Sequence, residues 1–169
     1  TWGALAANSS VVNSYGHVTL TGSSSSLNVF NLEASQLSGL YSFNLNVPTG
    51  STVLFNVSGT SGSFAYPSLS NFDASKTLWN FKDATTLSVN GLQGSILAPF
   101  AAVTATNSGQ TIQGQMFAAS LNGGINFGNA QFNGTGLPPV TNAVPEPASM
   151  IALGLGGLAL VRRRRAAKK

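Results

Sequence analysis

The sequence has no cysteine, a single histidine and few charged residues. Without cysteine, disulfides, thiolate nucleophiles and cysteine-based metal sites are excluded. His17 is the only imidazole, and it cannot by itself supply the several nitrogen or sulfur ligands of a zinc site. Charged residues make up 7% of the 169 residues, against about 25% in an average soluble domain. We therefore expect neither a metal nor a cofactor.

Three carboxylates, Glu33, Asp73 and Asp83, are the candidates for acid–base chemistry in residues 1–140. Glycoside cleavage needs two carboxyl groups that flank the scissile bond, and nothing in the sequence brings two of these together. The sequence also lacks a G-x-S-x-G elbow, a phosphate-binding P-loop and an aspartate-rich calcium loop. We expect no catalytic residues, and a polysaccharide-active enzyme is the weaker alternative.

The positive charge is confined to the C-terminal end. The formal net charge of the chain is +4, but residues 1–140 carry −1 and residues 141–169 carry +5. A nucleic-acid-binding domain usually presents a basic surface that follows the phosphates. The nearly neutral first 140 residues offer no such surface, so nucleic acid is not an expected partner.

Serine, asparagine and glycine are abundant instead. The chain holds 22 serine, 16 asparagine and 19 glycine residues, which favour turns over helix interiors. An apolar fraction of 43% is sufficient for a buried core. A long helical bundle is therefore excluded, and one β-rich domain is expected. Because the chain begins at Thr1 rather than methionine, we expect that its N-terminus has been trimmed.

Alternating apolar residues predict several β-strands. In 41–47 and 53–57, apolar side chains alternate with other side chains and each run ends at a turn sequence, the period of a half-buried strand. Residues 18–20 and 27–32 are shorter strand candidates, and 31–37 favours one or two helical turns. These patterns predict an all-β fold with one short or capping helix.

A triplet of an apolar residue, an amide residue and glycine recurs every twenty residues. It occurs at 92–94, 112–114 and 132–134, and the similarity of the first two continues over 95–98 and 115–118. Such a period is typical of solenoids, whose coils bury apolar residues by stacking on their neighbours. The glycines would turn corners that need a positive φ. The repeat predicts a β-solenoid or β-helix-like body, and chance similarity is the alternative.

Two aromatic residues, Trp79 and Phe81, flank a polar stretch together with Phe72. Exposed, Trp79 and Phe81 would provide a platform for stacking on carbohydrate. Aromatic residues in such a setting more often fill a core or cap the end of a solenoid.

Threonine pairs occur at Thr19 and Thr21 and at Thr104 and Thr106. An ice-binding face needs paired threonines in a regular array. Two isolated pairs do not make one, so ice binding is a weaker alternative.

The composition changes after residue 137. Residues 138–143 form a proline-containing spacer between a body, 1–137, and a C-terminal segment, 144–169, because such a spacer does not fit inside a packed element. The uncharged run 148–161 would form a helix about 21 Å long, short of the roughly 30 Å hydrocarbon core. The arginines that follow match the positive-inside pattern and their stems can lengthen the span. A transmembrane helix is favoured over an amphipathic helix or a buried hairpin, since the run has no polar stripe.

This segment resembles the PEP-CTERM sorting signal of Gram-negative bacteria, which places a Pro-Glu-Pro motif, a glycine-rich apolar run and a basic cluster in this order. The resemblance implies an anchor in the inner membrane and processing by an exosortase near the motif. It also implies an organism that makes exopolysaccharide and biofilm. The sorting motif consists of Val144, Pro145, Glu146 and Pro147, and the membrane-orienting cluster of Arg162, Arg163, Arg164 and Arg165.

The body resembles the choice-of-anchor A domain family of bacterial surface proteins. The resemblance covers about residues 17–136 and rests on segments 27–30, 53–60, 78–81 and 94–99, which occur in the family's order. Residues 94–98 also look like a coil of the ice-binding β-helix family, which implies a shared solenoid fold.

These features predict an exported, non-enzymatic surface or extracellular-matrix protein. The tail implies a membrane-anchored precursor that later reaches the cell surface or the matrix. Its expected partners are the inner membrane, an exosortase and exopolysaccharide. The alternatives are a carbohydrate-binding or adhesive module and, less favoured, an ice-binding-like protein or a polysaccharide-active enzyme.

Overall fold

The computed structural model describes residues 1–64, 68–105, 107 and 109–140. The chain divides into two compact units, Thr1–Pro138, called the body below, and Pro139–Lys169. The sorting motif, the predicted transmembrane run and the arginine cluster lie outside the described residues. In the part of the chain that is described, no helix has the length and apolar character needed to cross a membrane.

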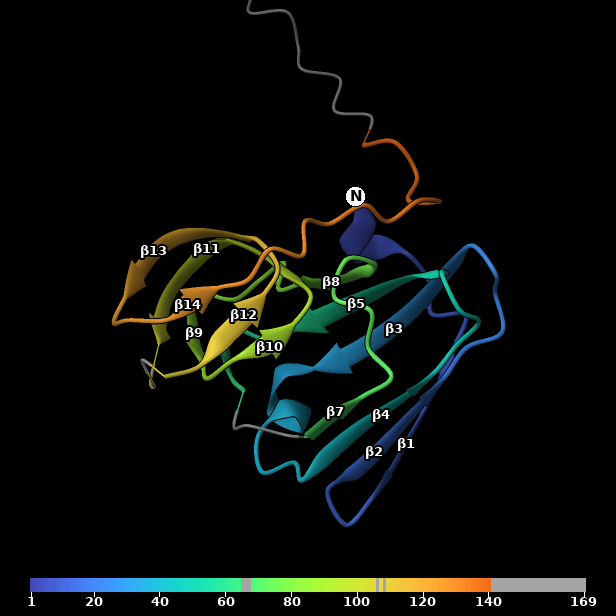
Figure 1. The fold of residues 1–169 in the computed structure, drawn as a ribbon, viewed down its shortest axis with the longest axis horizontal. Coiled ribbons are helices and arrows are strands. Elements are labelled where there is room, and N and C mark those ends of the chain that lie inside the picture. Colours follow the sequence, from blue (N-terminus) through green and yellow to red (C-terminus); the bar gives the residue numbers. More distant parts are fainter. Residues whose placement is uncertain (65–67, 106, 108, 141–169) are drawn as a thin grey trace, which may run out of the picture. The chain divides into compact units, whose positions relative to one another are not determined.

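In its described residues, the body consists of β-strands and two short 3-10 helices (Figure 1). The all-β prediction is confirmed, and one of the 3-10 helices lies in the predicted helical segment 31–37. The elements are η1 (Trp2–Ala4), β1 (Ser10–Ser14), β2 (His17–Thr21), β3 (Leu27–Glu33), η2 (Ala34–Leu37), β4 (Ser42–Asn46), β5 (Thr52–Ser58), β6 (Ser61–Ser63), β7 (Ser68–Ser70), β8 (Thr77–Asn80), β9 (Thr86–Val89), β10 (Leu92–Gln93), β11 (Ser95–Ala105), β12 (Thr111–Gln113), β13 (Met116–Asn122) and β14 (Asn126–Phe127).

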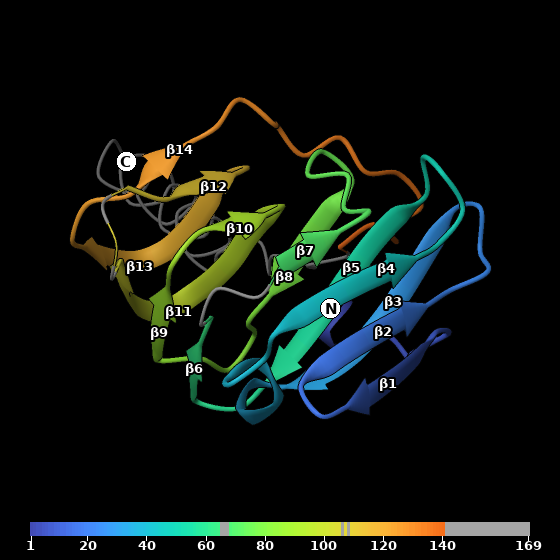
Figure 2. The same ribbon diagram turned by 60° about the horizontal axis from the view of Figure 1, so that its bottom comes forward.

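The strands form three sheets. Two of them have the orders β1-β2-β4-β7 and β10-β12-β14 and together are called the front layer. This layer lies toward the viewer in Figure 2. The third, called the back sheet, is curled and has the order β3-β5-β8-β11-β9-β6, with β13 also paired to β11. The antiparallel pair β1–β2 opens the front layer, and the other strand pairs are parallel.

The chain alternates between the front layer and the back sheet. Front strands β2, β4, β7, β10 and β12 are followed in sequence by back strands β3, β5, β8, β11 and β13. Each return brings equivalent residues into register, as where Phe30 lies opposite Phe55 and Phe55 opposite Trp79. Parallel strands need such crossover connections, since a tight hairpin reverses the chain.

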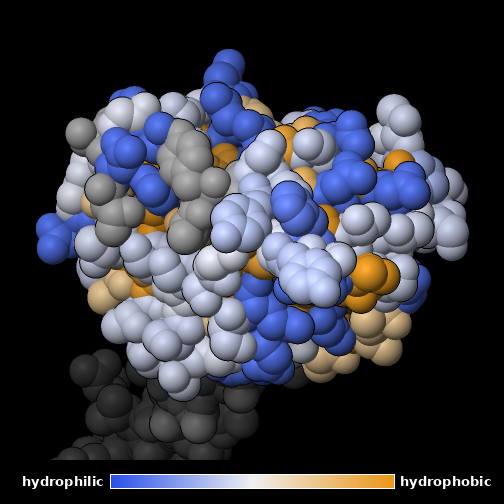
Figure 3. Space-filling model, turned by 90° about the horizontal axis from the view of Figure 1, so that it is seen from below, coloured by the Kyte–Doolittle hydropathy of each residue, from blue (hydrophilic) through white to orange (hydrophobic). Residues whose placement is uncertain are grey.

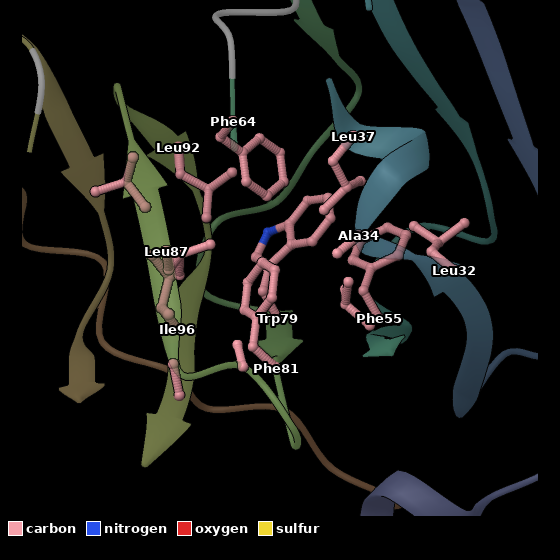
Figure 4. Packing of buried hydrophobic residues seen from close by; sticks show 14 of the residues in the cluster. Leu32, Ala34, Leu37, Phe55, Phe64, Trp79, Phe81, Leu87, Leu92 and Ile96 are labelled. Atoms are coloured by element: carbon pink, nitrogen blue, oxygen red, sulfur yellow. The ribbon is translucent and has the colours of Figure 1, made fainter. Parts of the chain in front are cut away.

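Aromatic side chains stack between the front layer and the back sheet. Phe55 lies between Phe30 and Trp79, with ring centroids at 5.2 Å and 4.0 Å. Phe43 and Phe64 meet Trp79 edge-on at 6.1 Å and 4.8 Å. Figure 4 shows Trp79 at the centre of this cluster, and all five residues are at most 1% exposed. In-register pairing of the strands therefore builds the core, because each coil of chain places its aromatic residue on the one before.

The outer side of the back sheet is also covered. Val29, Leu54 and Leu78 form a second apolar cluster there. The N-terminal segment packs on it, and so do residues 129–138, called the strap below, through Phe132 and Leu137. Consequently β5 has six buried residues in succession and is not the half-buried strand that the alternation in 53–57 predicts.

The strap is held by polar contacts along its length. The Asn133 N–H donates to the Ser75 carbonyl at 2.9 Å, and the Thr135 N–H donates to Thr52 Oγ1 at 2.7 Å. At the end of the strap, Trp2 Nε1 donates to the Pro138 carbonyl at 2.8 Å. The strap thus connects the two ends of the body across the outer side of the back sheet.

A row of asparagines crosses the outer side of β3, β5 and β8. Asn31, Asn56 and Asn80 lie opposite one another in register. Asn80 Nδ2 donates to Asn56 Oδ1 at 2.8 Å, and Asn56 Nδ2 donates to Asn31 Oδ1 at 3.4 Å and to the Trp2 carbonyl at 2.9 Å. Buried amides are therefore satisfied by one another and by the N-terminal segment.

The twenty-residue repeat is confirmed for its first two units and wrong for the third. Leu92 pairs with Ile112, and Ile96 pairs with Met116. The next strand places Phe127, not Phe132, opposite Ile112. Phe132 belongs to the strap and packs on the outer cluster. The third triplet resembles the first two in composition only, because the chain has already left the front layer when it reaches residue 132.

The glycines at the repeated corner act in two ways. Gly94 has a φ of 112°, a conformation that favours glycine. A side chain at Gly114 would overlap the backbone of Gly94 on the neighbouring pass. The corner therefore needs glycine at position 94 for its positive φ and at position 114 for its close approach to the backbone of Gly94.

Candidate functional site

Trp79 and Phe81 are both 0% exposed. Trp79 Nε1 donates to the Gln93 carbonyl at 2.9 Å inside the body, and Phe81 meets Phe64 edge-on at 6.2 Å. A sugar cannot stack on rings that other side chains already cover. The predicted carbohydrate contact at Trp79 and Phe81 is therefore wrong, and these residues fill the core.

His17 lies on the exposed side of β2. Its Nδ1 is 2.9 Å from Ser42 Oγ, and its ring centroid is 5.6 Å from that of Tyr41. A serine–histidine pair becomes a nucleophile when a carboxylate orients the imidazole. In the described residues, no hydrogen bond or ion pair joins His17 to a carboxylate. This pair therefore lacks the third member of a triad.

The three carboxylates of the body lie on different elements. Glu33 ends β3 and accepts a hydrogen bond from Ser58 Oγ at 2.7 Å. Asp73 precedes β8, whereas Asp83 follows it and pairs with Lys82. Among the described residues, no three histidine or carboxylate side chains gather as a metal site would require. In the described part of the chain, no hydrogen bond joins any two of these three carboxyl groups.

The exposed threonines do not continue from strand to strand. Thr19 on β2 lies opposite Asn44 on β4, which lies opposite Ser70 on β7. Thr104 is exposed on β11, and Thr106 lies outside the described residues. The row is therefore mixed in composition, and Asn44 is already engaged by Asn71 Nδ2 at 3.0 Å.

Among the recesses formed by the described residues, two are candidate sites. The first, called the gap recess, has a volume of about 260 Å³ and lies between β7 and β10. The second, called the turn recess, has a volume of about 290 Å³ and lies beside the turns 46–51 and 71–77. The gap recess is lined by Ser68, Leu69, Asn90, Gly91, Leu92, Gln93, Gln110 and Thr111.

The two recesses differ in charge. The turn recess includes Asp73 and Lys76, and both are engaged: Asp73 Oδ1 accepts from the Ser75 hydroxyl at 2.7 Å, and Lys76 Nζ donates to the Asn133 carbonyl at 3.1 Å. The gap recess has amide and hydroxyl side chains and no charged residue. No signal in the sequence marks this site, because its residues come from three separate passes of the chain.

Several large apolar residues are exposed in the described part of the chain, and aromatic residues are among them. Tyr15 and Tyr41 are 94% and 70% exposed beside His17. Phe100 and Phe117, on the last two back strands, are 67% and 63% exposed. Tyr15 and Tyr41 lie outside the strands, although the predicted run 41–47 begins at Tyr41. Phe100 and Phe117 are strand residues, and no local pattern shows whether a later strand or the strap will cover them.

One face of the body is largely polar. Figure 3 shows the body from below, where hydrophilic and intermediate residues cover most of the view and hydrophobic areas are small and separate. Hydroxyl and amide groups can donate and accept hydrogen bonds without attracting ions. Such a surface suits contact with other neutral, hydrated polymers.

Comparisons with known proteins identify both parts of the chain. Residues 1–134 match a family described as an ice-binding-like adhesive domain, which is not a known enzyme family. Residues 143–165 match the PEP-CTERM protein-sorting motif. No curated protein and no solved structure matches the chain. The resemblance to the choice-of-anchor A family is not shown by these comparisons.

Proposed function

Because the chain belongs to the ice-binding-like adhesive domain family, we propose that its body is a non-enzymatic adhesive module that contacts exopolysaccharide in the extracellular matrix of a biofilm. The PEP-CTERM motif marks an exported, surface-sorted protein that an exosortase processes. The observation that carries this proposal is the order of the two matches, with the adhesive domain followed by the sorting motif.

The body suits such a role as a short β-solenoid. Front and back strands follow one another in sequence, and equivalent residues return in register from β3 to β5, β8 and β11. This regular return supports the solenoid reading, and the segments 27–30, 53–60, 78–81 and 94–99 support kinship with the choice-of-anchor A family. A solenoid stacked on its own aromatic core would present a rigid surface outside the cell.

The tail would act as an address and a temporary anchor. Residues 148–161 would hold the precursor in the inner membrane of a Gram-negative cell, with Arg162–Arg165 in the cytoplasm. An exosortase would act near Val144–Pro147, and the body would then reach the surface or matrix.

The sorting step can be tested in a Gram-negative host with an intact exosortase. We expect the full chain to lose its tail there, and the variant P145A/E146A/P147A to stay unprocessed in the inner membrane. The matched control is P138A/P139A, which changes two prolines outside the sorting motif and should be processed normally. Processing of the triple variant, or of the wild-type chain in a host without exosortase, would refute this part of the proposal.

The adhesive step needs a separate measurement. The processed protein recovered from the host is passed over immobilised exopolysaccharide purified from the same culture. We expect retention that persists at high salt, because the body is nearly uncharged and screening weakens only charge–charge contacts. Elution with the unbound fraction at every salt concentration would contradict adhesion to matrix polysaccharide.

A further inference from the structure

The gap recess exists because the front layer is interrupted. β7 closes the sheet β1-β2-β4-β7, and β10 opens the sheet β10-β12-β14. Residues 71–76 connect β7 to β8, whereas Gly94 alone connects β10 to β11. In the front layer β10 pairs with β12 and not with β7. The edges of two front strands therefore face a recess of about 260 Å³.

The polar side chains of this recess have no partners among the described residues of the body. Five lining residues have a side-chain amide or hydroxyl group. None of these five groups makes a hydrogen bond to another described residue. Asn90 Oδ1 is buried and has no partner. An unsatisfied buried acceptor costs about 1–3 kcal/mol, so a turn of the Asn90 side chain that brings its amide to a ligand in the recess would remove this cost. The five residues are Ser68, Asn90, Gln93, Gln110 and Thr111.

The lining selects against ions. A calcium site needs several oxygen ligands, with carboxylates among them, and an anion site usually uses arginine, lysine or a helix N-terminus. The gap recess has none of these residues. A ligand that fits it is neutral and offers both hydrogen-bond donors and acceptors.

The recess also has an apolar part. Leu69 and Leu92 belong to its lining and pack on the main core. Trp79 in the core is joined to a lining residue, because its indole N–H donates to the Gln93 carbonyl at 2.9 Å. Apolar groups beside convergent hydrogen-bonding groups match a hexose ring, which has C–H faces and a rim of hydroxyls. The volume is below the roughly 300–1,000 Å³ of pockets for drug-sized ligands, which suits one sugar unit.

We propose that the gap recess binds one neutral hexose unit of a polysaccharide. The Asn90 side chain turns its amide into the recess to meet a sugar hydroxyl, and the amides of Gln93 and Gln110 contact neighbouring hydroxyls. This inference deepens the proposed adhesive function and rests on it for the source of the sugar. The turn recess is the weaker candidate, because its charged groups are already paired within the body.

Nuclear magnetic resonance of side-chain amides tests the site directly. The ¹⁵N-labelled full chain is kept in a detergent with a phosphocholine headgroup, since sugar headgroups would compete. Glucose, galactose, N-acetylglucosamine and cellobiose are the probes. We expect at least one of them to shift the amide signals of Asn90, Gln93 and Gln110 saturably, and to leave Asn71 in the turn recess unmoved. No saturable shift with any probe, or equal shifts in both recesses, would overturn the inference.

Two variants separate binding from folding. We expect Q110A and N90A each to weaken sugar binding by at least about tenfold, equivalent to about 1.4 kcal/mol. The matched control is T49A in the turn recess, which should bind as the wild-type chain does. Backbone spectra identify a variant that fails to fold, and Q110A is the safer of the two because Gln110 precedes a strand and is only half-buried. Unchanged affinity in folded Q110A and N90A would refute the site.

The outcomes distinguish this inference from the proposed function. If the wild-type protein is retained on exopolysaccharide and folded Q110A and N90A are retained equally well, the gap recess is not the contact and adhesion stands. If the recess binds hexose but the wild-type protein passes through the exopolysaccharide column, the recess stands and matrix adhesion falls.

Discussion

Strands β8 and β13 belong to the same curled sheet, yet every residue of β8 is buried and no residue of β13 is. β8 lies in the middle of the sheet, where the aromatic stack covers one side and the asparagine row and strap cover the other. In the described part of the chain, β13 pairs with β11 alone. The difference teaches that a strand is buried when other segments of the chain pack on both of its sides. We infer that this packing, rather than the strand's own residues, decides how much the strand contributes to stability.

The largest expected effect is at the centre of β8. Trp79→Ala should lower the free energy of unfolding by about 3–5 kcal/mol, because it empties the middle of the aromatic stack. Urea unfolding of the full chain, followed by circular dichroism, measures this change. Trp79→Phe keeps a ring in the stack and should cost clearly less. A small effect of Trp79→Ala would mean that β8 is not the better-supported strand.

The asparagine row should give the next largest effect. Asn56→Ala removes the acceptor for Asn80 Nδ2 and the donor to the Trp2 carbonyl. We expect a loss of about 2 kcal/mol, since the Asn80 amide is left unpartnered in a buried position. The matched change in β13, Asn122→Ala, should alter the same urea midpoint only slightly, because Asn122 is exposed. Equal losses would remove the distinction between the two strands.

The repeated corner should show an intermediate effect. Gly114→Ala places a methyl group against the backbone of Gly94, and we expect a loss of about 1–2 kcal/mol from this overlap. Gly109→Ala is the control, because a methyl group there meets only the Asn107 side chain at 3.5 Å. Thermal unfolding of both variants compares them. Equal melting temperatures would show that the passes at 94 and 114 are not in close contact.

The smallest effect is expected on the outer side of β13. Phe117 is 63% exposed, so Phe117→Lys should change the free energy of unfolding by no more than about 0.5 kcal/mol. Chemical denaturation of the full chain checks this. A loss above about 1 kcal/mol would mean that another part of the chain covers β13 and would weaken the contrast with β8.

Local patterns predicted the strands well because strand formation depends on neighbouring residues. The run 41–47 contains β4, and the run 53–57 lies within β5. The similarity between 92–98 and 112–118 corresponds to in-register pairing. The same patterns failed for Phe132, since a triplet of apolar, amide and glycine residues carries no information about which layer the chain has reached. They also failed for β5, because no local pattern shows that a distant strap will cover its outer side.

The candidate site was less predictable than the fold. Trp79 and Phe81 are conspicuous in the sequence, but their burial follows from the strands stacked on either side of them. The gap recess joins Ser68, Asn90 and Gln110 from three passes of the chain. The position of the recess depends on the spacing of the front strands, which is fixed only when the two layers assemble.

The sequence by itself determined that this chain is a β-rich, nearly uncharged body followed by a sorting tail, because composition, alternation and the order of the tail's elements are local properties. Tertiary structure alone decided which aromatic residues are buried, that β13 stays exposed and where polar groups remain unpartnered. The physical reason is that burial and hydrogen-bond satisfaction depend on contacts between residues far apart in sequence, which form only when successive passes of the chain stack.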